Sequence, residues 1–218
     1  MKSTLNCLSS LFIVASTFLM VSCGDPEKAM LSEQQKKDSL NHTTQRLNLE
    51  LRNYNELNDA PGFAGIYFVP EMLTLCVKDS ASLNKMAERY AQAFTTLEAE
   101  LQKLQLKSSG APGAINYNND PNNLVFECVY PIDVMPKKQP TKCQVVVLEE
   151  SNMLVYNYYG TYEALYKGYD KIGQLMKENN LVQSGPMREF YITDPGKVSD
   201  STKWLTRIMV PVFVPKAK

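Results

Sequence analysis

One order of elements occurs twice in this chain after residue 62, and this repetition leaves few folds open to it. In each copy, runs typical of strands precede one amphipathic helix, and further strand-like runs follow that helix. Ser109-Gly110-Ala111-Pro112 in the first copy matches Ser184-Gly185-Pro186 in the second, and Val129-Tyr130-Pro131 matches Val210-Pro211. The chain is therefore predicted to contain two β-α-β-β units.

The two predicted helices indicate the fold class. The first follows Ser82, a residue type that favours the N-cap, and its apolar face consists of Met86, Tyr90, Phe94, Leu97, Leu101 and Leu104. The second carries Leu165, Tyr169, Ile172 and Met176 at the same spacing. We therefore predict an α+β fold, with duplicated β-α-β-β units forming antiparallel sheet around a central cleft and two main helices packed outside.

The first residues are typical of a targeting signal. Lys2 supplies a positive start, and the apolar run from Leu8 to Val21 carries no charge. This run is shorter than the roughly 20 residues that a transmembrane helix needs. Ser22 followed by Cys23 resembles the lipobox of bacterial lipoproteins, although Met20 stands where leucine is usual. The resemblance implies cleavage after residue 22 and acyl chains, such as palmitate, on Cys23; an ordinary cleaved signal is the alternative.

Residues 23–61 differ in composition from the rest of the chain. They are rich in Glu, Gln, Lys, Asn and Asp and poor in large apolar groups, which is typical of a polar tether. Residues 62–218 are then the folded domain. We expect a protein of the bacterial cell envelope that is lipid-anchored, at the outer membrane, through Cys23 and does not span the bilayer.

Charge and histidine content argue against several functions. Removing residues 1–22 takes away one basic residue, Lys2, and leaves 22 basic against 23 acidic side chains. Nucleic acid is therefore not an expected partner. The single histidine, His42, lies in the tether, so the domain holds no histidine for a catalytic triad or a zinc site. No metal or cofactor is expected.

Three cysteines fall within the predicted domain, and an export compartment permits disulfides. Cys128 and Cys143 flank the polar segment 136–142, so they could face each other across two strands. With Cys76 they match no metal-ligand spacing. Buried free thiols are the alternative.

Three short segments in the second copy resemble a known family. They are Tyr159-Gly160-Thr161-Tyr162, Gly185-Pro186-Met187-Arg188-Glu189-Phe190-Tyr191 and Val210-Pro211-Val212. Together they resemble the GyrI-like effector-binding domain, over about Phe63 to Pro215. The resemblance implies a duplicated β-α-β-β fold that binds small, often cationic molecules. No helix-turn-helix accompanies it, so regulation of transcription by this chain is not implied.

Glu189 is the main candidate for a ligand-binding residue. In a strand it shares one face with Tyr191. A desolvated carboxylate among aromatic rings suits an organic cation, and the family resemblance places a pocket glutamate at this position. The alternative is a solvated charge, or a pair with Arg188 or Arg207.

The first copy lacks a matching carboxylate. Aligning Tyr117 with Tyr191 places Ile115 at the position of Glu189. We therefore predict that only the second copy contributes an acidic group.

Aromatic residues surround this region, and most are expected to be core. The set is Tyr156, Tyr158, Tyr159, Tyr162, Tyr166 and Tyr169. We favour Tyr158 and Tyr162 as ligand contacts. Trp204, near the start of the last strand, is either a flat pocket wall or a partly exposed edge aromatic.

Three functions are consistent with these features. The first is an envelope protein, not an enzyme, that binds a cationic or amphipathic small molecule beside Glu189. The second is a hydrolase of reactive small molecules that uses the same cleft, although no nucleophile-base pair is recognisable. The third is a protein-binding module of the envelope.

Overall fold

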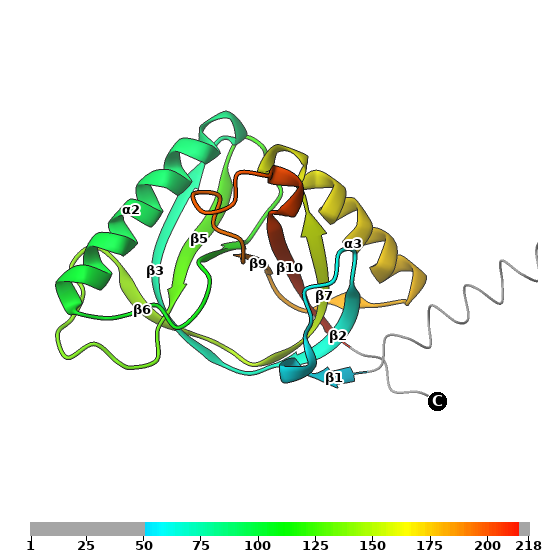
Figure 1. The fold of residues 1–218 in the computed structure, drawn as a ribbon, viewed down its shortest axis with the longest axis horizontal. Helices are drawn as coiled ribbons and strands as arrows, with labels where there is room; N and C mark the ends of the chain where they lie inside the picture. Colours follow the sequence, from blue (N-terminus) through cyan, green and yellow to red (C-terminus); the bar gives the residue numbers. More distant parts are fainter. Residues whose placement is uncertain (1–50, 214–218) are drawn as a thin grey trace, which may run out of the picture. The chain divides into compact units, whose positions relative to one another are not determined.

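The computed structural model describes residues 51–213 (Figure 1), so the predicted signal, Cys23 and most of the tether lie outside the described residues. The main helices are α2 (Met86–Leu104) and α3 (Tyr166–Glu178). The strands are β1 (Leu51–Asn53), β2 (Ala64–Val69), β3 (Met72–Ala81), β4 (Gly113–Asn116), β5 (Leu124–Pro131), β6 (Gln144–Leu148), β7 (Ser151–Tyr159), β8 (Val182–Gln183), β9 (Met187–Tyr191) and β10 (Leu205–Phe213).

The strands form one curled sheet in the order β1-β2-β7-β10-β9-β4-β5-β3-β6, with β8 pairing to β10. Only the short β1 pairs in parallel, and the other described pairs are antiparallel. The first repeat unit is β3-α2-β4-β5 and the second is β7-α3-β9-β10. The predicted α+β duplication is confirmed.

The strand that precedes each unit in the chain pairs with the other unit. β2 precedes the first unit in the chain but pairs with β7 of the second, and β6 precedes the second unit but pairs with β3 of the first. The units also meet directly, because β4 pairs with β9 at the centre of the sheet. Each unit therefore depends on the other for a neighbouring strand on both sides.

A pair of glycine-proline contacts fixes which residues of the two units correspond. A Cβ on Gly110 would lie 3.4 Å from Pro131, and a Cβ on Gly185 would lie 3.4 Å from Pro211. The next backbone bonds match as well, since Ser109 N donates to the Pro131 carbonyl and Ser184 N donates to the Pro211 carbonyl. Gly110 thus corresponds to Gly185, and Pro131 to Pro211.

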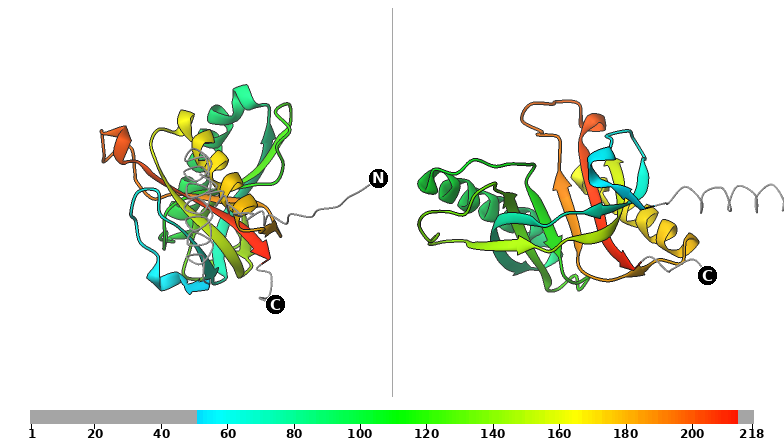
Figure 2. Two further views of the ribbon diagram at one scale, coloured as in Figure 1. Left: turned by 90° about the vertical axis from the view of Figure 1, so that its right-hand side faces the viewer. Right: turned by 90° about the horizontal axis from the view of Figure 1, so that it is seen from below.

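Both helices lie on one face of the sheet, α2 over the first unit and α3 over the second (Figure 1; the right-hand view of Figure 2). Each is preceded by a 3₁₀ turn, Leu83–Lys85 and Tyr162–Ala164. Ser82 occupies the N-cap position of the first 3₁₀ turn, but its hydroxyl donates to the Asn84 side chain and does not cap a backbone N–H. The α-helix itself begins at Met86. The predicted helix is confirmed, and its start lies four residues after Ser82.

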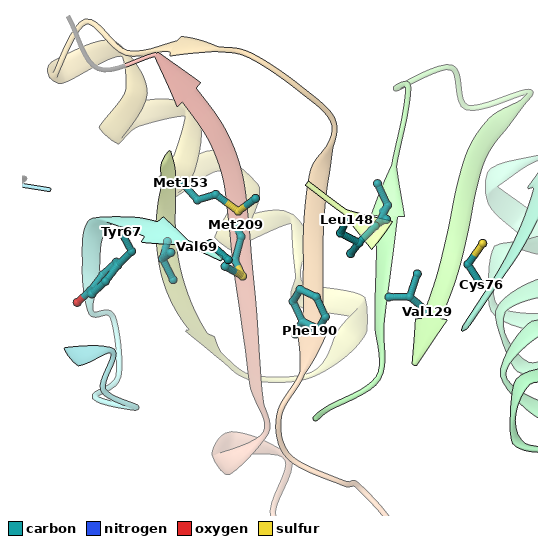
Figure 3. Close-up of a cluster of buried hydrophobic side chains, with 10 residues drawn as sticks. Tyr67, Val69, Cys76, Val129, Leu148, Met153, Phe190 and Met209 are labelled. Carbon is teal, nitrogen blue, oxygen red and sulfur yellow. The ribbon is translucent and has the colours of Figure 1, made fainter. Parts of the chain in front are cut away.

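Apolar side chains fill both faces of the sheet. Between α2 and the sheet they include Leu75, Leu97 and Phe126, and between α3 and the sheet they include Leu154 and Ile208. The opposite face carries a third cluster, drawn in Figure 3, that takes residues from both units: Tyr67, Val69, Cys76, Ile115, Val129, Leu148, Met153, Val155, Phe190 and Met209. This shared cluster joins the two units into one core.

Gly113 permits the close meeting of β4 and β9. A Cβ at this position would lie 2.3 Å from the carbonyl oxygen of Glu189 and 2.7 Å from the ring of Phe190. No side chain fits there without moving backbone. The residue therefore fixes the spacing of the strand that carries Glu189.

The three described cysteines, Cys76, Cys128 and Cys143, are free thiols. Cys128 lies on β5, opposite Val77 of β3, while Cys143 precedes β6 on the far side of β3. One strand thus separates the two residues, and the disulfide that the sequence left open is not formed. Burial raises the pKa of Cys76 and of Cys128 to about 12 and that of Cys143 to about 11.

Within residues 51–213, no helix is long and apolar enough to cross a membrane. No group of three or more acidic, cysteine or histidine side chains in that range is arranged to hold a metal ion.

Candidate functional site

Glu189 lies at the centre of the sheet, on the face that carries the helices. Its side chain is only 2% exposed. Oε1 accepts hydrogen bonds from Asn116 Nδ2 at 2.6 Å and from the Tyr169 hydroxyl at 2.7 Å, and Oε2 accepts one from the Tyr191 hydroxyl at 3.1 Å. The carboxyl group is therefore held by three uncharged donors from β4, α3 and β9.

Burial dominates the protonation of this carboxyl group. It raises the pKa of Glu189 above its ordinary value, and the three hydrogen bonds oppose that shift. Burial and the Glu189 charge together raise the pKa of Tyr191, so its hydroxyl stays a hydrogen-bond donor at neutral pH. A cation beside Glu189 would favour the ionised carboxylate.

Neither neighbouring arginine neutralises Glu189. Arg188 points to the opposite face and donates from Nη2 to the Glu149 carbonyl at 3.0 Å. Arg207 forms an ion pair with Asp59 and bonds Asn157. Both alternatives from the sequence, a solvated charge and an arginine pair, are therefore wrong for Glu189.

Aromatic rings form a connected series beside the carboxyl group. The Tyr162 ring lies 5.4 Å from that of Tyr191 and 5.6 Å from that of Trp204. Phe94 of α2 contacts Tyr191 from the other side, at 6.1 Å between ring centroids. Tyr162 is 39% exposed, while Trp204 is half-buried and donates from Nε1 to the Val198 carbonyl at 2.7 Å. These rings therefore extend from the buried acid to the surface.

The first unit holds no acid at the corresponding position. Four residues after Gly110 the chain has Ala114, and four residues after Gly185 it has Glu189. The two residues also pair directly across β4 and β9. The sequence alignment on Tyr117 was one residue out of step, because it named Ile115, whose side chain lies in the cluster on the opposite face.

A second difference between the units lies beneath the helices. Five residues before Pro131 is Phe126, and five before Pro211 is Thr206. Phe126 packs against Tyr90 of α2, with ring centroids 4.6 Å apart. Thr206 is fully buried, and among the described residues its hydroxyl has no hydrogen-bond partner. The second unit thus has a small polar side chain where the first has a ring.

A model of the GyrI-like small molecule binding domain matches residues 65–212, well over half of the chain. The chain belongs to the GyrI-like family. No curated protein sequence matches it significantly. The family resemblance noted from the sequence is therefore confirmed, and the domain is one that binds small molecules.

Solved structures show the same GyrI-like fold. The EcmrR C-terminal domain has a TM-score of 0.64 at 17% identity, covering 71% of this chain and 99% of its own. A hydrolase from Listeria innocua has a TM-score of 0.56 at 15% sequence identity, and the match covers 73% of this chain and 96% of the hydrolase. SAV2435 bound to tetraphenylphosphonium has a TM-score of 0.51 at 17% sequence identity, and the match covers 69% of this chain and 94% of SAV2435. At these low sequence identities, the comparisons show that the fold is shared and nothing more.

Sequence reasoning selected part of this GyrI-like site. The structure brings Glu189, Tyr191, Tyr162 and Trp204 together through the contacts above. It does not bring Tyr158 to Glu189, because the Tyr158 ring is buried in the cluster beneath α3 and its hydroxyl bonds the Thr161 carbonyl at 3.4 Å.

Sequence reasoning missed Asn116, Tyr169 and Tyr90 as members of the site. Tyr90 and Tyr169 correspond, since each lies eight residues after the N-cap of its 3₁₀ turn, Ser82 or Thr161. A tyrosine at matching positions of both helices was the signal that could have found them.

The described residues also outline a hollow away from Glu189. Its volume is about 460 Å³, and it is lined by residues 51–55, Phe68 and Pro70. It contains no carboxylate and lies at the β1 edge of the sheet. The hollow therefore lacks an acidic group, unlike the site at Glu189.

Proposed function

We propose that this protein is a lipid-anchored protein of the bacterial envelope whose GyrI-like domain binds a small organic cation at Glu189. One observation carries the ligand assignment: a carboxyl group that is 2% exposed has three hydrogen bonds to uncharged donors and no ion pair with either nearby arginine. A buried carboxylate without a counter-ion is unfavourable. A ligand cation supplies the missing charge.

The aromatic rings favour an organic cation over a metal ion or a small inorganic one. The faces of tyrosine and tryptophan attract cations within about 6 Å of the ring centroid, and they also pack against apolar groups. Tyr162 and Trp204 are partly exposed, so they can contact a ligand that approaches from solvent. A cation with aromatic substituents satisfies both the rings and the acid.

Binding requires a small rearrangement, because Glu189 is covered in the structure described. Tyr162 and Tyr169, at 39% and 37% exposure, are the most exposed of the rings around it. Tyr162 begins the 3₁₀ turn before α3, and its ring contacts only other rings among the described interactions. We infer that this ring moves aside when a ligand enters.

A protein of similar fold supports the ligand class. SAV2435 was solved bound to tetraphenylphosphonium, a lipophilic cation. This ligand has no hydrogen-bond donor, so any attraction to a carboxylate is electrostatic. It is therefore a suitable first probe.

Titration calorimetry on the full chain tests the ligand assignment. Tetraphenylphosphonium is compared with uncharged triphenylphosphine oxide, in the wild type and in Glu189→Gln. Removing one partner of a desolvated charge pair costs about 2 to 5 kcal/mol, so the cation should lose at least about thirtyfold in affinity. The neutral compound should lose little, and Tyr191→Phe should weaken the cation less, since the ring remains.

The same experiment can contradict the proposal. Equal cation affinity in wild type and Glu189→Gln would make Glu189 a structural residue. Turnover of an ester by the wild type that disappears in Glu189→Gln would instead support the hydrolase alternative.

The anchor is proposed from the sequence at Ser22-Cys23. Cys23→Ser should abolish labelling by radioactive palmitate and release the protein from membranes of the expressing cell, because it removes the acylated thiol. Release is measured by fractionation and blotting. Retention of the unlabelled variant in the membrane fraction would contradict the lipid anchor.

A further inference from the structure

The two oxygens of Glu189 are not equivalent. Oε1 accepts two hydrogen bonds, from Asn116 Nδ2 and the Tyr169 hydroxyl, and both are short, at 2.6 and 2.7 Å. Oε2 accepts one, from the Tyr191 hydroxyl, and it is longer at 3.1 Å. Each carboxylate oxygen offers about two lone-pair positions. Oε1 is therefore saturated, and Oε2 has one position left for a ligand.

Asn116 is held in the orientation that saturates Oε1. The Tyr90 hydroxyl donates to Asn116 Oδ1 at 3.0 Å, which leaves Nδ2 directed at Glu189. The reversed amide would place Oδ1 against a carboxylate oxygen and lose the bond to Glu189, while the Tyr90 hydroxyl would have to accept from Nδ2 instead of donating. Asn116 lies two residues after Ala114, on the face that Glu189 shares.

Tyr90 is itself fixed by packing. Its ring lies 4.6 Å from Phe126 and 6.3 Å from Phe94, measured between centroids. Tyr90 is therefore a positioning residue that acts on the carboxyl group through Asn116. This role belongs to the first unit, whose own position for an acid is occupied by alanine.

We propose that the Tyr90–Asn116 pair makes Glu189 a one-oxygen acceptor, so the site selects ammonium-type cations over amidinium and guanidinium ions. An amidinium binds a carboxylate best through two parallel N–H···O bonds, one to each oxygen. An ammonium is a compact charge that one oxygen satisfies. The inference rests on the proposed function and narrows its ligand class.

The test compares two probes that share a ring system, 2-naphthylmethylammonium and 2-naphthamidinium, by calorimetry at pH 7 on the full chain. The wild type should prefer the ammonium. Asn116→Leu removes the donor at similar volume and frees Oε1, so the affinity ratio should shift about tenfold toward the amidinium, the value of one hydrogen bond to a charged group. Tyr90→Phe keeps the ring but releases Asn116, and should shift the ratio in the same direction by roughly threefold.

Tyr117→Phe is the matched control, because Tyr117 is exposed and its hydroxyl bonds Glu127 on the opposite face of the sheet. It should leave the ratio unchanged. An unchanged ratio in both Asn116→Leu and Tyr90→Phe, with both cations still dependent on Glu189, would overturn this inference and leave the proposed function intact. If neither cation bound the wild type, both the inference and the proposed function would be overturned.

Discussion

The two repeat units have the same elements, and they differ where a ligand would bind. The first unit has Ala114 and Phe126 at the positions where the second has Glu189 and Thr206. At these positions the first unit has apolar side chains, while the second buries an acid and a hydroxyl that has no hydrogen-bond partner among the described residues. One copy can therefore supply stability, while the other tolerates the unfavourable groups that binding requires.

The first unit still contributes to the site through its partners. Asn116 of β4 and Phe94 of α2 contact Glu189 and Tyr191, which belong to the second unit. The exchange of β2 and β6 makes separation of the units costly, because each loses a paired strand. The difference between the units is thus a division of roles within one domain.

The largest effect should come from the glycine that lets the units meet. Gly113→Ala places a Cβ against the Glu189 carbonyl and the Phe190 ring, so we expect a loss of about 3 kcal/mol in the free energy of unfolding. For a domain of this size that lowers the melting temperature by roughly 10 °C. Calorimetric melting of the purified protein measures it.

Gly173→Ala is the control for that change. A Cβ at Gly173 meets nothing within 4 Å, and the residue lies in an exposed part of α3. Higher helix propensity should stabilise this variant by up to about 1 kcal/mol. If the Gly113→Ala protein were as stable as Gly173→Ala, strands β4 and β9 could move apart without a loss of stability.

The next effect concerns the acid that only one unit carries. Since the folded-state pKa of Glu189 is raised, the folded protein holds this proton more tightly than the unfolded chain does. The resulting stabilisation is present at low pH and is lost as pH rises through the folded-state pKa. Glu189→Gln removes this dependence while its amide can still bond all three partners. The variant should be more stable than wild type at pH 8, by on the order of 1 kcal/mol.

Thermal melts from pH 5 to pH 8 test this claim. The stability difference between Glu189→Gln and wild type should grow with pH across that window. Parallel pH curves for the two proteins would mean that Glu189 is no more costly to ionise when folded than when unfolded.

The smallest effect is expected at Thr206. Thr206→Val keeps the shape and removes a buried hydroxyl without a described partner, so stability should rise by up to about 1 kcal/mol. Urea unfolding resolves a change of this size. A loss of stability would show that the hydroxyl has a stabilising partner in solution.

The sequence predicted the fold well because repetition, helix spacing and strand alternation are local signals. It predicted Glu189 and Tyr191 as a pair for the same reason, since alternate residues of a strand share a face. It did not indicate that Tyr158 packs beneath α3 and away from Glu189, or that the pairing of β4 with β9 brings Asn116 to Glu189. The register between strands far apart in the chain cannot be predicted from a single sequence. A one-residue error in aligning the two units therefore placed Ile115, and not Ala114, at the position of Glu189.

The most direct test of a binding site in the second unit is a crystal structure with tetraphenylarsonium, because the anomalous signal of arsenic locates the cation without bias. We predict one arsenic position within about 6 Å of the Tyr162 or Trp204 ring, on the Glu189 side, with the Tyr162 ring displaced. Arsenic at the hollow lined by residues 51–55, or among Leu75, Leu97 and Phe126 between α2 and the sheet of the first unit, would contradict this account.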